Sequence, residues 1–97
     1  MHARLTSVAI QPDKIDEASR IYRDSIIPAV QQQKGNKAAY LLVDHATGKG
    51  VSITLWDSEA DAQAYESSGS YREQVGKVAQ FFTSPPSLAT YTVTAHT

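Results

Sequence analysis

The stretch Gly50–Tyr71, GVSITLWDSEADAQAYESSGSY, predicts a strand that ends in the only tryptophan of the chain and runs directly into a helix. Two sets of residues alternate in its first part, with Val51, Ile53 and Leu55 on one face and Ser52, Thr54 and Trp56 on the other. This two-residue period is typical of a β-strand. Neither face carries a charge, which indicates a central strand buried on both sides. Asp57 or Ser58 then begins the helix.

The rest of the chain supplies three more strands and two more helices. We expect strands over residues 5–10, 37–44 and 88–95. A helix opens at Pro12 and presents an apolar face from Ile15 to Ala29. It should kink or break at Pro28, because proline has no backbone N–H. A capping box of Ser70 and Glu73 begins the last helix, over residues 71–82.

The order of these elements is strand, helix, two strands, a helix in two pieces and a final strand. The segment HATGKG, residues 45–50, joins the second and third strands as a hairpin in which Gly48 and Gly50 can take positive φ. This order predicts a ferredoxin-like α+β fold, with a four-stranded antiparallel sheet and helices on one face. We expect one domain over residues 1–97.

Composition narrows the classes of function. Nine basic and ten acidic residues give a formal charge of −1 without a basic block, which argues against nucleic acid and anionic membranes as partners. The absence of cysteine excludes disulfides and thiolate metal sites. No segment has the length and apolarity of a membrane span or a signal peptide, so we expect a soluble cytoplasmic protein.

A second copy of the chain is the expected partner. Two helices cover only one face of a four-stranded sheet, yet the other face also lacks charge through the middle of each strand. Such an uncharged patch is large for a monomer. A two-fold interface that pairs identical sheets would cover it, so the sequence predicts a homodimer.

These features resemble the antibiotic biosynthesis monooxygenase family of the dimeric α/β barrel superfamily. The similarity rests on the Pro28-Ala29 break with Gly35 before a Tyr-Leu-Leu strand at residues 40–42, and on the junction Trp-Asp-Ser-Glu-Ala at residues 56–60. The resemblance implies a homodimer whose two sheets form a barrel, with a cleft between sheet and helices in each subunit.

The resemblance also implies roles for particular residues. In the cofactor-free oxygenases of this family, a tryptophan at the end of the third strand lines the cleft, and Trp56 matches it. Those enzymes often place an amide four residues earlier, where this chain has Ser52. Haem-degrading members need a histidine on the following helix, and residues 57–86 contain none.

From these considerations Trp56 and Ser52 are the candidate catalytic residues. Candidate substrate-binding residues are Thr54, Tyr40, Tyr91 and Arg72. Tyrosines on the helices are expected to pack, with their hydroxyls reaching water: Tyr22, Tyr65 and Tyr71. The alanines at positions 60 and 64 are expected to leave space beneath their helix. No motif for a metal, haem or flavin is present, so no cofactor is predicted.

The predicted function is a cofactor-independent monooxygenase that acts with dioxygen on a small phenolic or quinol-type aromatic substrate. The substrate itself would supply the electrons, because nothing in the sequence indicates a redox cofactor. The alternative is a non-catalytic dimeric domain that binds a small molecule in the same cleft. A third possibility is a dimer without a ligand, in which Trp56 only packs.

Overall fold

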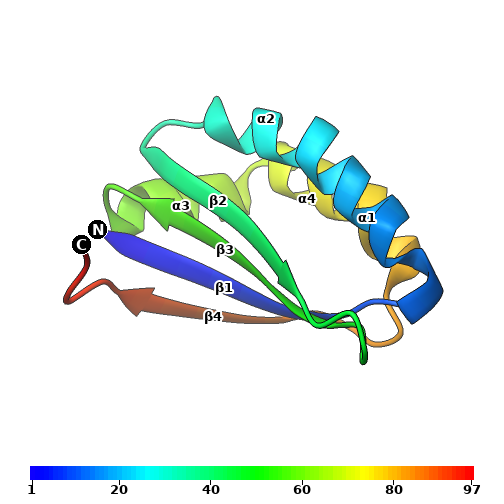
Figure 1. Cartoon of the computed structure of the whole chain (residues 1–97). Helices are drawn as coiled ribbons and strands as arrows, with labels where there is room; N and C mark the ends of the chain where they lie inside the picture. Colours follow the sequence, from blue (N-terminus) through cyan, green and yellow to red (C-terminus); the bar gives the residue numbers. More distant parts are fainter.

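A four-stranded antiparallel sheet forms one layer of the structure, and helices cover one of its faces (Figure 1). The computed structural model describes residues 1–97. Its strands are β1 (His2–Ala9), β2 (Asn36–Val43), β3 (Lys49–Trp56) and β4 (Ser87–Thr92). They lie in the order β2-β3-β1-β4, so β3 and β1 are the central strands. This is the ferredoxin-like α+β fold that the sequence predicts.

The helical layer consists of two stretches that lie side by side (Figure 1). The first comprises the 3₁₀ turn η1 (Pro12–Lys14), α1 (Ile15–Ile21), the π-helix η2 (Tyr22–Ile26) and α2 (Ile27–Gln31). The second comprises α3 (Glu59–Ser67), α4 (Gly69–Val78) and the 3₁₀ turn η3 (Ala79–Phe81). None of these helices is long and apolar enough to cross a membrane.

Proline 28 does not interrupt the first stretch, contrary to the expected kink or break. The backbone N–H of Ile27 donates to the carbonyl of Tyr22, a five-residue step in place of the usual four. Pro28 then falls within the first two positions of α2, directly after the π-helix. The π-helix therefore accommodates the proline, and the chain remains helical to Gln31.

Three other details differ from the sequence-based expectation. Strand β1 begins at His2 and so includes Arg4. Ser68 caps α4 by accepting from the backbone N–H of Tyr71, so Gly69 and Ser70 lie inside that helix. Ala60 and Ala64 are exposed, because α3 turns its other side, with Ala62 and Tyr65, toward the sheet. The two alanines therefore leave no space beneath α3.

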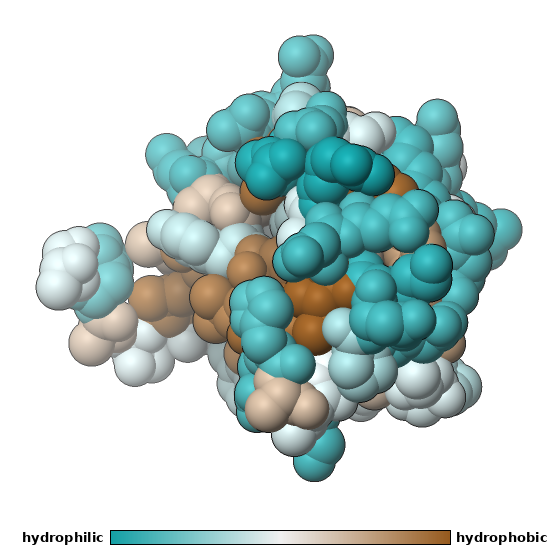
Figure 2. Space-filling model, turned by 45° about the vertical axis from the view of Figure 1, so that its right-hand side comes forward, coloured by the Kyte–Doolittle hydropathy of each residue, from teal (hydrophilic) through white to brown (hydrophobic).

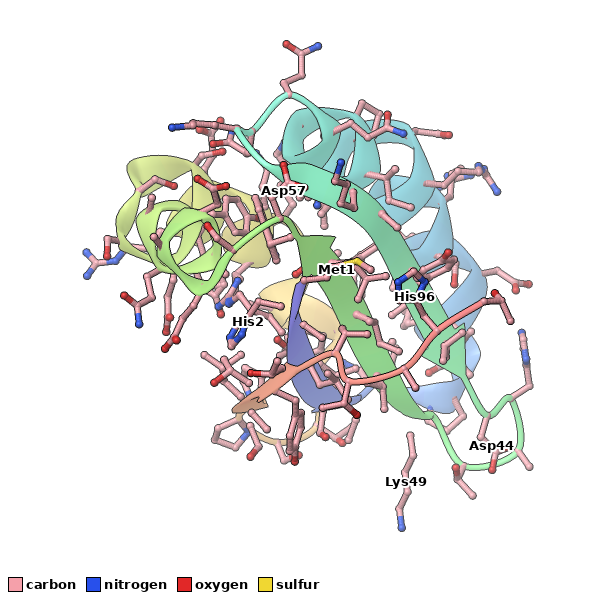
Figure 3. All side chains as sticks on the ribbon, turned by 90° about the vertical axis from the view of Figure 1, so that its left-hand side faces the viewer. Met1, His2, Asp44, Lys49, Asp57 and His96 are labelled. Atoms are coloured by element: carbon pink, nitrogen blue, oxygen red, sulfur yellow. The ribbon has the colours of Figure 1, made fainter.

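Register assigns each strand residue to a face. On the face toward the helices, Arg4 pairs with Thr54, and Thr6 with Ser52. The outer face contains three rows of paired residues, all uncharged: Tyr40, Ile53, Leu5 and Ala89; Leu42, Val51, Ser7 and Ser87; and Ala38, Leu55, Ala3 and Tyr91. Asp44 and Lys49 lie by the hairpin at one end of the sheet, and Asp57 lies at the other end (Figure 3).

The hairpin between β2 and β3 depends on Gly48, which has a φ of 80°. Its carbonyl accepts from the backbone N–H of Ile10 at 2.8 Å, which ties the hairpin to the end of β1. A β-carbon at this position would overlap the carbonyl oxygen of Ile10. Gly50, the other glycine expected to use positive φ, does not do so.

We predict that Gly48→Ala lowers the free energy of unfolding by about 1–3 kcal/mol, because it adds backbone strain and a steric overlap. The matched control is Gly76→Ala, in the middle of α4, where a β-carbon meets no atom within 4 Å. This control should stabilise the protein by about 0.5–1 kcal/mol. Urea denaturation followed by circular dichroism measures both, and equal stabilities of the two variants would contradict the role assigned to Gly48.

Candidate functional site

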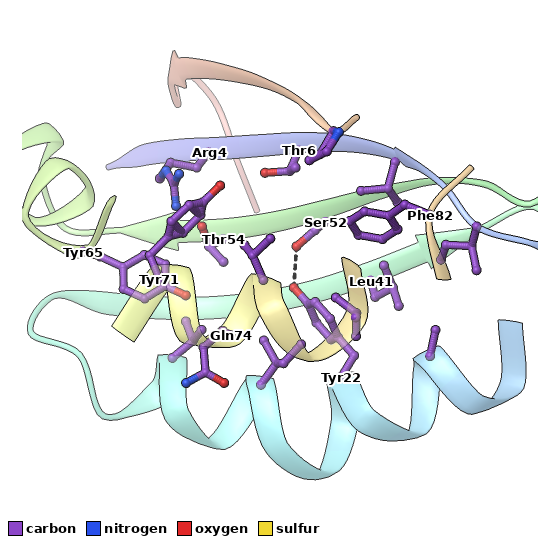
Figure 4. A pocket seen from close by; sticks show the side chains of 18 residues that line it. Arg4, Thr6, Tyr22, Leu41, Ser52, Thr54, Tyr65, Tyr71, Gln74 and Phe82 are labelled. Carbon is purple, nitrogen blue, oxygen red and sulfur yellow. Dashed lines mark hydrogen bonds between the residues drawn. The ribbon is translucent and has the colours of Figure 1, made fainter. Parts of the chain in front are cut away.

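A cavity of about 80 Å³ lies between the inner face of the sheet and the helices. This is several times the space that one water molecule needs. Twelve of its 18 lining residues are hydrophobic. The polar groups come from both layers, as Figure 4 shows: Arg4, Thr6, Ser52 and Thr54 from the sheet, and Gln74 with the tyrosine hydroxyls from the helices. An apolar space with a few converging polar groups is the usual form of a small-molecule site.

A hydrogen bond between the hydroxyls of Tyr22 and Ser52 lies in the middle of the cavity lining (Figure 4). Tyr22 opens the π-helix, and Ser52 lies on the central strand β3. Tyr22 is buried. The pair joins the first helical stretch to the sheet and places two hydroxyl groups next to an apolar space.

Trp56 lies behind the cavity wall rather than in it. The side chain is fully buried and is not among the cavity-lining residues. Its indole Nε1 donates to Thr54 Oγ1 at 2.9 Å, and its ring stacks on Tyr65 with centroids 5.1 Å apart. Because the Thr54 oxygen accepts from the indole, its own hydroxyl hydrogen is free to donate to another group. Trp56 therefore orients two residues that do line the cavity.

One end of the cavity holds Arg4, with only 3% of its surface exposed. Its guanidinium carbon lies 4.6 Å from the centroid of the Tyr71 ring and 5.6 Å from that of Tyr65. These are cation–π distances. Neither Nε nor Nη2 has a hydrogen-bond partner. Buried polar groups in proteins are normally satisfied, so this exception indicates a place for a ligand.

Tyr22 and Tyr65, the two buried tyrosines of the cavity, remain protonated at neutral pH. Burial raises the pKa of the Tyr65 hydroxyl to about 12, against a lowering by the charge of Arg4 and further raising by Tyr22 and Tyr71. Burial also raises the pKa of Tyr22, while its hydrogen bond to Ser52 lowers it. At neutral pH both side chains are therefore hydrogen-bond donors and not general bases.

The candidate site residues predicted from the sequence lie in three parts of the structure. Ser52 and Thr54 line the cavity, and Trp56 supports it from behind. The other candidates lie elsewhere. Tyr40 and Tyr91 point to the outer face of the sheet, because they pair with Ile53 and Ala3 in the outer rows. Arg72 is exposed on α4 and is not among the lining residues.

The sequence analysis does not identify several residues that line the cavity. The helical tyrosines were expected to send their hydroxyls to water, but Tyr22 and Tyr65 are buried at the cavity. The predicted first strand, residues 5–10, does not include Arg4. A signal for it was present, because Arg4, Thr6 and Val8 continue the two-residue alternation on the side that β1 turns toward the helices. A charge on the inner face of a central strand is rare unless it has a function.

Solved structures share this fold over nearly the whole chain. A monooxygenase of Streptomyces coelicolor, crystallised with nanaomycin D, superposes with a TM-score of 0.84 at 11% identity, covering 99% of this chain and 89% of that one. A Mycobacterium tuberculosis protein, Rv0793, gives a TM-score of 0.77 at 18% identity, with coverages of 98% and 96%. At these identities the similarity shows the fold alone.

The sequence comparisons identify the family. An uncharacterized M. tuberculosis protein, Rv2557, is 34% identical over 55 residues, which cover 57% of this chain but only 25% of the relative. The matched region thus spans about a quarter of the length of the curated relatives. The model of the antibiotic biosynthesis monooxygenase family matches residues 1–77, most of the chain. The chain therefore belongs to the antibiotic biosynthesis monooxygenase family.

Proposed function

We propose that the protein is a cofactor-independent monooxygenase that oxidises a small phenolic or quinol-type aromatic molecule with dioxygen. The observation that carries this proposal is the apolar cavity with a buried guanidinium, whose Nε and Nη2 have no hydrogen-bond partner, and with the Tyr22–Ser52 hydroxyl pair beside it. An aromatic ring suits the apolar walls. A positive charge and several hydroxyl donors suit the anion that a phenol becomes when it loses its proton.

The proposed reaction needs no electron source other than the substrate. The bound phenolate transfers electrons to dioxygen, a ring carbon forms a bond to oxygen, and loss of water from the resulting hydroperoxide leaves a quinone carbonyl. Phenol and dioxygen thus give quinone and water. In this scheme the hydroxyl donors at the Tyr22–Ser52 pair favour ionisation of the substrate, whose proton passes to water.

The protein groups stabilise the anion and keep bulk water from the intermediates. One of the two hydroxyls of the Tyr22–Ser52 pair donates to the other, and the remaining hydrogen of the pair donates to the substrate oxygen. Thr54, held by the indole of Trp56, supplies a second donor. Trp56 acts through Thr54 and Tyr65 and is a positioning residue. The S. coelicolor monooxygenase of similar fold was crystallised with nanaomycin D.

We also propose that the protein is a homodimer in which two outer sheet faces meet. That face exposes Tyr40, Leu42 and Tyr91 by 51, 52 and 57%, and its paired rows contain no charge. Figure 2 shows hydrophobic surface across the centre of the molecule, surrounded by hydrophilic residues. Such a patch is typical of an interaction surface, and a two-fold pairing would cover it with an identical one.

We predict that Ser52→Ala and Tyr22→Phe each lower kcat/KM by at least about tenfold for any quinol that the wild type oxidises, because each disrupts the hydroxyl pair that donates to the developing anion. Oxygen uptake with a panel of naphthols and hydroquinones measures this. The matched control is Ser67→Ala, which removes an exposed hydroxyl at the end of α3 and should leave kcat/KM unchanged. Saturable binding without oxygen uptake by any compound would favour the non-catalytic binding domain instead.

The second prediction concerns assembly. Ile53→Glu places a charge in the middle row of the outer face and should convert a dimer into monomers at micromolar concentration, because a buried interface would leave that charge unpaired. Analytical ultracentrifugation measures the mass. Glu73→Gln, at an exposed position on α4, is the control and should remain dimeric. A wild type that sediments only as a monomer would refute the proposed pairing.

The third prediction concerns the tyrosine protons. The pKa of Tyr65 rises from its usual value of 10 to about 12 on folding, so the unfolded chain releases this proton first as the pH rises. The free energy of unfolding should therefore fall as the pH rises from about 10 toward 12. Tyr65→Phe should make this fall smaller, whereas Tyr91→Phe, on the outer face, should not. Urea denaturation at several pH values between 8 and 11.5 tests this, and equal slopes for the two variants would contradict it.

A further inference from the structure

The proposed oxidation leaves hydrogen-bond donors of Arg4 without an assigned partner. The guanidinium can donate five hydrogen bonds, yet Nε and Nη2 donate none, although only 4% of its side chain is exposed. A buried charge without partners is costly, and removal of water from it must be offset by another interaction. The two tyrosine rings interact with its faces and leave the in-plane N–H groups unsatisfied.

No carboxylate of the protein accepts a hydrogen bond from the Arg4 guanidinium. The nearest acid is Glu66, whose Oε1 lies 4.0 Å from Nη2. This distance is too long for a hydrogen bond, and the Glu66 side chain is 43% exposed. The lining of the cavity contains no aspartate or glutamate. Arg4 therefore lines the cavity while two of its guanidinium nitrogens, Nε and Nη2, are buried without a hydrogen-bond partner.

We infer that Arg4 binds a carboxylate group of the ligand, so that the substrate class of this site is an aromatic hydroxy acid. This deepens the function proposed above and rests on it for the oxidation step alone. The planar fork of a guanidinium matches the two oxygens of a carboxylate and binds them with two parallel hydrogen bonds. Arg4 is the only charged residue among those that line the cavity, so one negative charge balances it. A carboxylate meets that requirement better than a phosphate dianion.

The register of the sheet separates the two ends of such a ligand. Arg4 pairs with Thr54, whereas Thr6 pairs with Ser52. The two pairs are two residues apart along the strands, about 6.6–6.8 Å. One aromatic ring with substituents on opposite carbons spans a distance of this order. A ligand with its carboxylate at Arg4 would therefore place a hydroxyl near Ser52 and Tyr22, with the ring between apolar side chains from the helices (Figure 4).

The test compares each acid with its neutral amide, which has nearly the same shape. Calorimetric titration and Trp56 fluorescence at pH 7.5 give the dissociation constants of 4-hydroxybenzoate, 4-hydroxybenzamide, 6-hydroxy-2-naphthoate and the corresponding naphthamide. Trp56 reports on this end of the cavity because it stacks on Tyr65, which borders Arg4. We expect each acid to bind about 10- to 100-fold more tightly than its amide, as for hydrogen bonds to charged groups.

Two variants assign this preference to Arg4. Arg4→Met keeps much of the side-chain volume and should reduce the ratio between acid and amide to about one, while the affinity for the amide changes little. Glu66→Gln removes the only nearby negative charge and should leave acid binding unchanged or tighter. Circular dichroism confirms that each variant is folded. The comparison of acid and amide in the wild type needs no variant, so it tests the inference even if Arg4→Met fails to fold.

The outcomes separate this inference from the proposed oxidation. Equal binding of acid and amide by the wild type, no saturable binding of either acid, or a preference that survives in Arg4→Met would each overturn the carboxylate site. Oxygen uptake with neutral quinols would leave the proposed function standing in those cases. Conversely, tight and Arg4-dependent binding of the acids without any oxygen uptake would support the carboxylate site and refute the oxidation.

Discussion

The stacking of Trp56 on Tyr65 fixes the relation between the sheet and the second helical stretch, and the cavity depends on it. Trp56 ends β3, and Tyr65 lies on the buried side of α3, so this one contact sets how α3 lies against the sheet. The same indole holds the hydroxyl of Thr54 at 2.9 Å. Tyr65 in turn lies edge-on to Tyr71 with ring centroids 5.6 Å apart. The aromatic cluster around Arg4 thus combines Tyr65 of α3 with Tyr71 of α4.

Most of the fold could be predicted from the sequence because its signals are local. The alternation through Val51, Ile53 and Leu55 indicated a central strand, and the hydroxyl of Ser58 does begin the following helix by accepting from the N–H of Asp61. Gly48 turns the hairpin with positive φ, as expected. The prediction of boundaries was less accurate: the capping-box pattern favoured Ser70 as the start of the last helix, whereas Ser68 caps α4.

The candidate site was predicted only in part, for a different physical reason. Ser52 and Thr54 were found because strand period alone places them on one face. Tyr40 and Tyr91 alternate in the same way, but period does not say which of the two faces meets the helices. The polar contacts of Tyr22 and Arg4 join residues far apart in the chain, so no local pattern reveals them. The pairing of Tyr22 with Ser52 exists only in the assembled structure.

The π-helix at Tyr22–Ile26 has a consequence for how this cavity can vary among related chains. One added residue per turn shifts every later side chain by about 100° around the helix axis. Ala18 lies before the π-helix, Tyr22 and Ile26 are its first and last residues, and Val30 follows it, and all four line the cavity. Loss of a single residue here would re-phase one half against the other. Deletion of one residue can thus remove the contact between Tyr22 and Ser52 without any substitution in the sheet.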